Sequence, residues 1–237
     1  QLVRRGVDPA AFYDEFLRVR GLFRAGGVRR DEPREAIAAL LLGEVAGGVE
    51  VGRDEVTRLR AIYEALKGHH WFLTGADDLP ACALLVGEAG TPAAIADGVE
   101  AIYAALQGVG LGPGDPLQRV AMNLYLGRRD GACARVGALR AAFVAAEQPI
   151  RPLEYPGLSL LGLITGASAP SLSAEVVQLK ERVVVELGAT PGEAFNIAAS
   201  LVYLGDAGAG ADAAAMRILD LELLLLAYFF GVSLSTY

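Results

Sequence analysis

The stretch Leu59–Leu66 reads LRAIYEAL, and the stretch Val99–Leu106, which begins forty residues later, reads VEAIYAAL. In both, apolar residues stand at offsets 0, 3 and 7, the spacing of one face of an α-helix. Complete triplets recur further along the chain at Val136/Leu139/Phe143 and Val176/Leu179/Val183. An incomplete copy stands earlier in the chain, at Val19/Leu22. Starting at Val19, the steps from one copy to the next are 40, 40, 37 and 40 residues. A constant period of this length indicates stacked helical units that bury their apolar faces against one another.

A second helix is expected after each triplet, with a proline at its start. The prolines precede Ala/Leu-rich runs and are Pro33, Pro80, Pro116, Pro156 and Pro191. Proline is tolerated at the first helical position because the N–H that it lacks has no intrahelical partner there. Thr190 and Glu193 add a predicted capping box. Each run then reaches a glycine that is expected to end the helix in the left-handed conformation. These glycines are Gly43, Gly87, Gly127, Gly166 and Gly205.

Together the repeated triplets and the repeated runs from a proline to a glycine predict an all-α protein, an α-solenoid-like array of about five helix pairs with a ~40-residue period. No linker-like stretch divides the chain, so residues 1–237 are predicted to form a single all-helical repeat domain. The expected units are approximately residues 10–48, 49–90, 91–130, 131–168 and 169–208. A capping helix over residues 212–230 is expected to follow, because the last unit of such an array leaves an apolar face uncovered.

Composition and charge narrow the class of protein. Apolar residues make up 53% of the chain and the mean hydropathy is +0.38, which fits helices that are buried on several sides. A net charge of −7 would repel a phosphate backbone, so nucleic-acid binding is not expected. Cys82 and Cys133 fall in helical segments rather than in a secreted disulfide framework, and no signal peptide is visible, so a cytoplasmic location is expected. No nucleophile elbow or phosphate-binding loop is present, and neither a catalytic residue nor a cofactor is expected.

The C-terminal segment is strongly apolar. Its uncharged stretch, Leu223–Tyr237, has 15 residues, whereas a membrane-spanning helix needs about 20, so no membrane span is expected. Asp220 and Glu222 precede this stretch and are interpreted as polar interruptions of the apolar surface. A helix that caps the last repeat and a homodimer contact through this helix are both open interpretations. In either case four side chains are expected to be mostly buried, namely Leu224, Leu226, Phe229 and Phe230.

The loop between the helices of the second unit contains both histidines and the only tryptophan of the chain, followed by two aspartates. Imidazole and carboxylate groups are ligands of divalent metals, and neighbouring carboxylates can separate their pKa values for acid–base chemistry. An alternative therefore treats the chain as a metal-dependent hydrolase or small-molecule sensor whose metal ligands are His69, His70, Asp77 and Asp78. Against it, adjacent histidines point in different directions in an extended chain. The aspartates are also explained as caps of the helix that follows.

Tyr63 and Tyr103 directly follow the central isoleucine of their triplets, and the equivalent residues of the next two units are Arg140 and Lys180. This position lies beside the buried stripe, so an aromatic and then basic strip is expected on one face of a curved array. Tyrosine, tryptophan and arginine are favoured at binding surfaces. The candidate binding residues are therefore Tyr63, Tyr103, Arg140, Lys180 and Trp71.

Two asparagines, Asn123 and Asn196, interrupt helices that are otherwise apolar. Buried amides need hydrogen-bond partners, so each is expected to join neighbouring units by a hydrogen bond. Lining a binding surface is the alternative that the sequence leaves open for both residues.

The segment Leu73–Pro80 reads Leu-Thr-Gly-Ala-Asp-Asp-Leu-Pro and lies between the similar stretches Ala61–Leu66 and Glu100–Leu106. With these stretches, residues 60–127 resemble a bacterial family described only as a domain of unknown function. The resemblance implies a bacterial, cytoplasmic, helical protein, and it carries over no catalytic residues. The favoured interpretation is thus a protein-binding or scaffolding helical-repeat protein that is not an enzyme, with the metal-dependent alternative still open.

Overall fold

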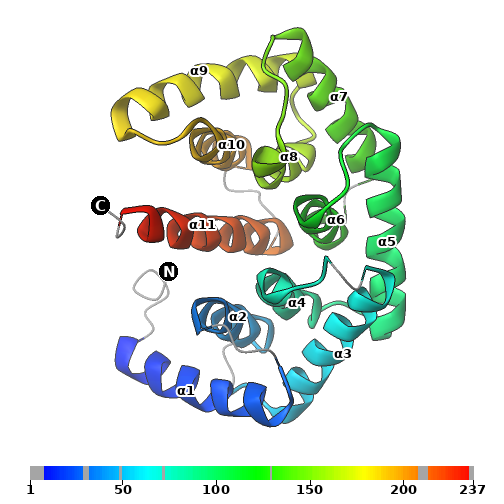
Figure 1. Cartoon of the computed structure of the whole chain (residues 1–237), viewed down its shortest axis with the longest axis vertical. Helices are drawn as coiled ribbons and strands as arrows, with labels where there is room; N and C mark the ends of the chain where they lie inside the picture. The colour runs from blue at the N-terminus through cyan, green and yellow to red at the C-terminus, as the bar shows by residue number, and fades with distance from the viewer. Residues whose placement is uncertain are drawn as a thin grey trace. The chain divides into compact units, whose positions relative to one another are not determined.

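The computed structural model describes residues 8–28, 32–47, 50–70, 73–128, 130–207 and 213–234. Across these ranges the chain forms eleven α-helices, two short 3₁₀ helices and no strand (Figure 1). The described chain is therefore all-α, as the sequence predicts. By its internal contacts the protein divides into two compact units, unit 1 (Gln1–Asp97) and unit 2 (Gly98–Tyr237), and their boundary falls within helix α5 (Pro92–Gly108). The single domain over residues 1–237 stays a prediction.

Unit 1 contains two helix pairs before α5. The helices are α1 (Pro9–Ala25), α2 (Glu32–Val45), α3 (Arg53–His69) and α4 (Leu79–Leu85), and the 3₁₀ turn η2 (Ala76–Asp78) leads into α4. Helix α1 packs against α2 and α3, and α4 also packs against α2 and α3. The first helices of the two pairs are therefore neighbours, and so are the second helices.

Unit 2 repeats this neighbour pattern. Its remaining elements are α6 (Asp115–Gly127), α7 (Ala132–Ala145), η3 (Pro152–Glu154), α8 (Tyr155–Gly162), α9 (Ala169–Leu187), α10 (Pro191–Ala207) and α11 (Ala213–Leu234). The first helices α7 and α9 pack together, and the second helix α8 packs against both α6 and α10 (Figure 1). Helix α11, which the sequence predicts as a cap on the last repeat, contacts α10 of that repeat and also the two earlier second helices α6 and α8.

The apolar triplets form the buried face of the first helices, as predicted. In the four complete triplets every residue is buried except Ile102 and Leu179, which are half-buried. In the incomplete first copy Val19 is buried, and Phe23 rather than Leu22 completes the buried face. Removal of this apolar surface from water is the main favourable term in folding. The 40-residue register therefore identifies the core-facing side of each first helix.

The prediction for the starts of the second helices is also confirmed. Each of the five prolines is the first or second residue of its helix, in α2, α4, α6, α8 and α10. At the start of α10, the Thr190 N–H donates to Glu193 Oε2 at 2.9 Å, and the Glu193 N–H donates to Thr190 Oγ1 at 3.5 Å. This reciprocal pair is the predicted capping box, and it satisfies N–H groups that the helix itself leaves unpaired.

The closing role predicted for the repeated glycines is wrong. Gly43 and Gly205 lie inside α2 and α10, and none of the five repeated glycines has a positive φ. The left-handed residues after first helices α1, α5 and α9 are other glycines, Gly27, Gly110 and Gly188, with φ of +72°, +88° and +64°. At least one repeated glycine serves close packing instead. A Cβ added at Gly127 would lie 2.5 Å from Cδ2 of Leu163, so a side chain there would force its neighbour to move.

An arginine directly before the triplet recurs in three first helices and binds main-chain carbonyls beyond its own helix. Arg58 donates from Nε to Val86 O at 3.0 Å, and from Nη2 to Glu88 O at 2.6 Å and Gly90 O at 2.9 Å. The corresponding arginines are Arg18, which donates to Val51 O, and Arg135, which donates to Gly162 O. At the ends of α4 and α8 these carbonyls lack intrahelical partners, and the helix dipole favours a cation there.

Replacement of Arg58 by alanine is expected to lower the free energy of unfolding by about 2 kcal/mol, because hydrogen bonds from a charged donor are lost at partly buried carbonyls. Urea denaturation followed by circular dichroism measures this change. Arg182→Ala is the control, since Arg182 pairs only with exposed Glu186 at 3.3 Å among its described contacts and should cost less than about 0.5 kcal/mol. Equal losses for the two variants would contradict the capping role of Arg58.

Candidate functional site

The two histidines of the candidate metal site lie at the end of α3 and have different surroundings. His69 Nε2 is 3.1 Å from Asp97 Oδ1. His70 follows the last residue of α3, and its main-chain N–H donates to Leu66 O at 3.2 Å. His69 is therefore paired with a carboxylate, Asp97, that lies outside the four residues proposed from the sequence.

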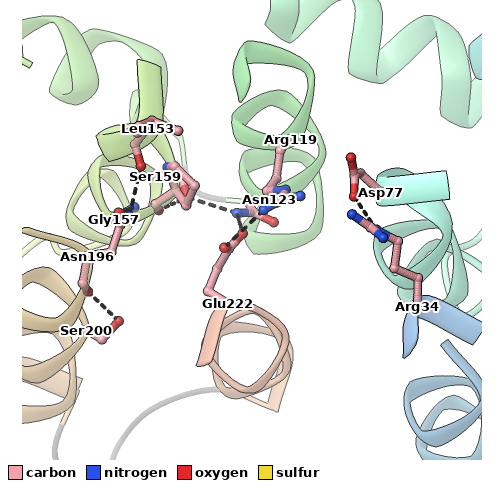
Figure 2. A network of polar contacts seen from close by, with 11 residues as sticks. Arg34, Asp77, Arg119, Asn123, Leu153, Gly157, Ser159, Asn196, Ser200 and Glu222 are labelled. Atoms are coloured by element: carbon pink, nitrogen blue, oxygen red, sulfur yellow. Dashed lines mark hydrogen bonds and ion pairs between the residues drawn. The ribbon is translucent and has the colours of Figure 1, made fainter. Parts of the chain in front are cut away.

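The two aspartates also have separate roles. Asp77 binds the guanidinium of Arg34 on α2 (Figure 2). Asp78 is buried, and its Oδ2 accepts a hydrogen bond from the Gly75 N–H at 2.9 Å, which caps η2. The carboxylate of Asp78 therefore caps the 3₁₀ turn η2 and not α4, at whose N-cap position it makes no side-chain hydrogen bond, so the capping of α4 predicted for both aspartates is not observed. Within the described ranges no group of three or more His, Cys, Asp or Glu residues is placed to hold a metal ion, so the geometry gives the metal-dependent alternative no support.

The predicted binding tyrosines hold the loops of their own helix pairs. Tyr63 is half-buried in unit 1, and its hydroxyl donates to Thr74 O at 3.3 Å. Tyr103 is buried in unit 2, and its hydroxyl accepts a hydrogen bond from the Gly114 N–H at 3.1 Å. Trp71, the third predicted aromatic, lies outside the described residues. The observed contacts of both tyrosines are therefore structural, and their binding role stays a prediction.

The predicted basic residues lie in unit 2. Arg140 is half-buried on α7. Lys180 on α9 places its Nζ 3.6 Å from Glu154 Oε1 and 3.3 Å from Gln148 Oε1, in the segment that joins α7 to α8. Lys180 thus ties its helix to the preceding pair, and the strip proposed from the sequence stays a prediction.

Tyr63 also lines a small pocket in unit 1. The pocket has a volume of about 180 Å³, and α3 supplies the polar side chains Arg60, Glu64 and Lys67 to its wall. Sites for drug-sized ligands have volumes of about 300 Å³ or more. The pocket is therefore too small to indicate a ligand of that class.

A more distinctive arrangement lies in unit 2, where buried polar groups join α11 to α6 and α8 (Figure 2). Asn123 Nδ2 donates to Glu222 Oε1 at 2.8 Å and to Ser159 Oγ at 2.9 Å. The Ser159 hydroxyl in turn donates to Pro156 O at 2.6 Å. Arg119 Nη1 lies 3.9 Å from Glu222 Oε2. We call Arg119, Asn123, Ser159 and Glu222 the Glu222 cluster.

Three members of the Glu222 cluster are removed from solvent, and Arg119 is half-buried. The exposed fraction is 0% for Asn123 and Ser159 and 7% for Glu222. Burial raises the pKa of the Glu222 carboxyl, while Arg119 and the hydrogen bond from Asn123 act in the opposite direction. Among the described residues, the Asn123 Oδ1 atom has no hydrogen-bond partner. A buried acid of this kind is costly unless it is paired, so the cluster sets the position of α11 on the other helices.

The sequence predicts part of this arrangement. Asn123 joins α6 to α8 and α11, and Asn196 on α10 donates to Leu153 O at 2.8 Å and accepts from the Gly157 N–H at 2.9 Å. The hydrogen bonds that the sequence predicts between neighbouring helix-pair repeats are thus confirmed for both asparagines. The interpretation of Glu222 as a polar interruption of the apolar surface is wrong, because its carboxylate faces inward.

Helix α11 buries its apolar residues to different extents. Leu221 and Leu225 are buried together with Asp220 and Glu222, whereas Leu223, Leu224 and Leu226 are half-buried. The Phe229 and Phe230 side chains, also expected to be mostly buried, lie outside the described part. Across the described residues no helix is long and apolar enough to cross a membrane. The homodimer contact through this helix stays a prediction.

The stability of the protein is expected to depend on the protonation of Glu222. Because its folded-state pKa is raised, the native state binds the proton more tightly than the unfolded chain does. The stabilisation that this tighter proton binding gives the folded state is complete below the ordinary pKa of a glutamate. It is lost as the pH rises from that value through the raised pKa of Glu222. Urea denaturation over this range, compared between wild type and Glu222→Gln, should show a wild-type stability that falls with pH relative to the variant. Parallel profiles would contradict the raised pKa.

Comparison with known proteins identifies a family for most of the chain. The family model described as "Protein of unknown function (DUF4003)" matches residues 7–207. The chain therefore belongs to this family, which confirms the resemblance to an uncharacterised domain family and extends it well beyond residues 60–127. No curated protein and no solved structure matches the chain. The match ends at residue 207, at the end of α10, so α11 lies outside it.

Proposed function

We propose that this DUF4003 protein is a cytoplasmic, α-solenoid-like helical-repeat protein that binds a protein partner through its second helices. The observation that supports the proposal is the neighbour pattern, in which first helices pack on first helices and second helices on second helices within each unit. Helical-repeat proteins of this kind present extended rows of helices as binding surfaces. The free thiols of Cys82 and Cys133 support a reducing compartment.

Helix α10, the last of the second helices in unit 2, also presents apolar side chains to solvent. Leu201 and Leu204 on α10 have exposed fractions of 46% and 39% and stand three residues apart, on one side of the helix. Residues three apart on a helix are neighbours on its surface. An exposed apolar pair beside a row of packed helices is suited to contact with a partner protein.

Affinity capture from a bacterial lysate tests the proposal. The bait is the full chain, compared with a Leu201→Glu/Leu204→Glu variant on α10. The matched control is Val185→Glu/Leu187→Glu, which places the same charges on exposed positions of the first helix α9. The α10 variant is expected to lose a captured protein that wild type and the α9 variant retain. Capture of no protein by wild type, or the same set of proteins by all three, would count against partner binding through the second helices.

A further inference from the structure

The pocket beside α3 in unit 1 gathers three charged side chains that form no ion pair with one another. Arg60, Glu64 and Lys67 line it and stand at offsets 0, 4 and 7, so they follow one side of the helix. Oppositely charged residues three or four apart on a helix can pair. Among the residues that the structure describes, however, neither Glu64 nor Lys67 has a hydrogen bond or an ion pair. Both charges are therefore open to a ligand.

The other walls of the pocket are apolar and come from separate segments of unit 1. Val28 lies in the loop after α1, and Ala76 and Leu79 belong to η2 and α4. Leu59 and Leu79 have exposed fractions of 0% and 2%, so part of the lining belongs to the core. The pocket thus combines buried aliphatic side chains with a few charged groups, which is the composition of small-molecule sites.

The loop after α1 holds the guanidinium of Arg60 in place. Its Nη1 donates to Gly26 O. Gly27 has a φ of +72°, and a Cβ added there would lie 2.9 Å from Nη1 of Arg60, so a side chain at this position would displace the guanidinium. A guanidinium has five N–H donors, and a carboxylate binds two of them in parallel. Arg60 is therefore fixed by one donor and retains others for a carboxylate in the pocket.

The size and charge of the pocket define the class of ligand. Its volume is about 180 Å³, and an engineered cavity of about 150 Å³ holds benzene, so a ligand of roughly six to ten non-hydrogen atoms fits. Arg60 and Lys67 together outweigh Glu64, so the pocket favours an anion. Glu64 stands between the two cations along α3 and repels a ligand that carries only negative groups. Two carboxylates and one ammonium group match all three side chains.

We propose that this pocket binds an acidic α-amino acid, L-glutamate or L-aspartate. The two carboxylates pair with Arg60 and Lys67, the ammonium group pairs with Glu64, and the methylene groups contact Leu59 and Leu79. Both amino acids have about ten non-hydrogen atoms, as the volume requires. This function goes beyond the partner binding proposed for α10, because every lining residue belongs to unit 1. It also needs none of the four candidate metal ligands, since none of them lines the pocket.

Isothermal titration calorimetry on the full chain tests the ligand class. L-Glutamate and L-aspartate are compared with glutarate, which lacks the ammonium group, and with L-glutamine, which lacks one carboxylate. Saturable binding of at least one acidic amino acid is expected. Glutarate and L-glutamine should each bind at least about 10-fold more weakly than the preferred amino acid, because each loses one charge pair.

Three variants test the assigned side chains. Glu64→Gln keeps the size of the side chain, and it is expected to weaken binding of the amino acid at least about 10-fold while glutarate binds as well as before or better. Lys67→Gln should weaken both ligands. Asp54→Asn is the matched control, because it changes the net charge by the same amount at an exposed position of α3 that does not line the pocket. It should bind like wild type.

The proposal is overturned if neither amino acid binds wild type saturably up to about 10 mM, a concentration that reveals even millimolar affinity. Equal affinity for L-glutamate and glutarate would also overturn it, as would equal effects of Glu64→Gln and Asp54→Asn. Circular dichroism checks that each variant is folded, and the comparison of ligands on wild type decides the question if a variant is not. The capture experiment concerns α10 in unit 2, so its outcome is independent of these titrations.

Discussion

Asn123→Leu is expected to lower the free energy of unfolding by about 3 kcal/mol. The leucine fills the volume of the amide but removes the donor at 2.8 Å from Glu222 Oε1, so a buried carboxylate is left with Arg119 at 3.9 Å as its nearest described charge. A buried ion or polar group that loses its partner has this large effect because the interior cannot replace water as a hydrogen-bonding solvent. The loss should be greatest at neutral and higher pH, where Glu222 is more often ionised.

A double-mutant cycle separates the pair from its surroundings. Glu222→Leu alone leaves the Asn123 amide short of an acceptor and is expected to cost about 1–3 kcal/mol. The double variant Asn123→Leu/Glu222→Leu replaces the whole pair with apolar groups, and such replacements are often neutral or stabilising. It should therefore be more stable than either single variant in urea denaturation. Additive losses from the two single variants would show that Asn123 and Glu222 do not act together.

The first helices could be predicted from the sequence because their polar and apolar residues are segregated. In α3, for example, Leu59, Ile62 and Leu66 are buried. Arg58, directly before Leu59, reaches a main-chain carbonyl, and Arg60, directly after it, is exposed to solvent. A period of 3.6 residues then has one possible core-facing side. The prolines of the second helices could be predicted for a local reason, since proline is compatible with a helix mainly in its first turn.

The orientation of α11 could not be predicted in this way. Residues Leu219, Leu221, Leu223, Leu224, Leu225 and Leu226 surround the helix axis, so hydrophobic periodicity does not select a buried side. The inward side is chosen by tertiary contacts, above all the hydrogen bond between Glu222 and Asn123, which lie 99 residues apart in the sequence. The signal in the sequence was Asn123, an amide that needs a buried partner, but nothing local identifies the partner as Glu222.

Closeness in the sequence also failed to predict which residues the candidate metal ligands contact. His69, His70, Asp77 and Asp78 are close in the sequence, yet their contacts lead to Asp97, Leu66, Arg34 and Gly75. The contacts of His70 and Asp78 are local, whereas the partners of His69 and Asp77 lie 28 and 43 residues away in the sequence. Proximity along the chain is weak evidence for convergence when the intervening segment contains a turn and the start of a new helix.

Phe143→Ala is expected to lower the free energy of unfolding by about 4 kcal/mol, the range for a fully buried phenylalanine. Phe143 ends the third complete triplet on α7 with an exposed fraction of 0%, and its ring packs edge-on against Phe195 of α10, with 5.3 Å between the centroids. The substitution therefore removes apolar burial and an aromatic pair between a first helix and a second helix. Because the site lies in the packed core, the neighbouring helices can refill only part of the cavity.

The adjacent residue provides the control for this loss. Val144→Ala lies on the same helix at an exposed fraction of 50%, and it should cost less than about 0.5 kcal/mol. Phe143→Leu keeps most of the volume and is expected to fall between the two variants. A small loss for Phe143→Ala, close to that of Val144→Ala, would contradict the 40-residue register as the determinant of the core.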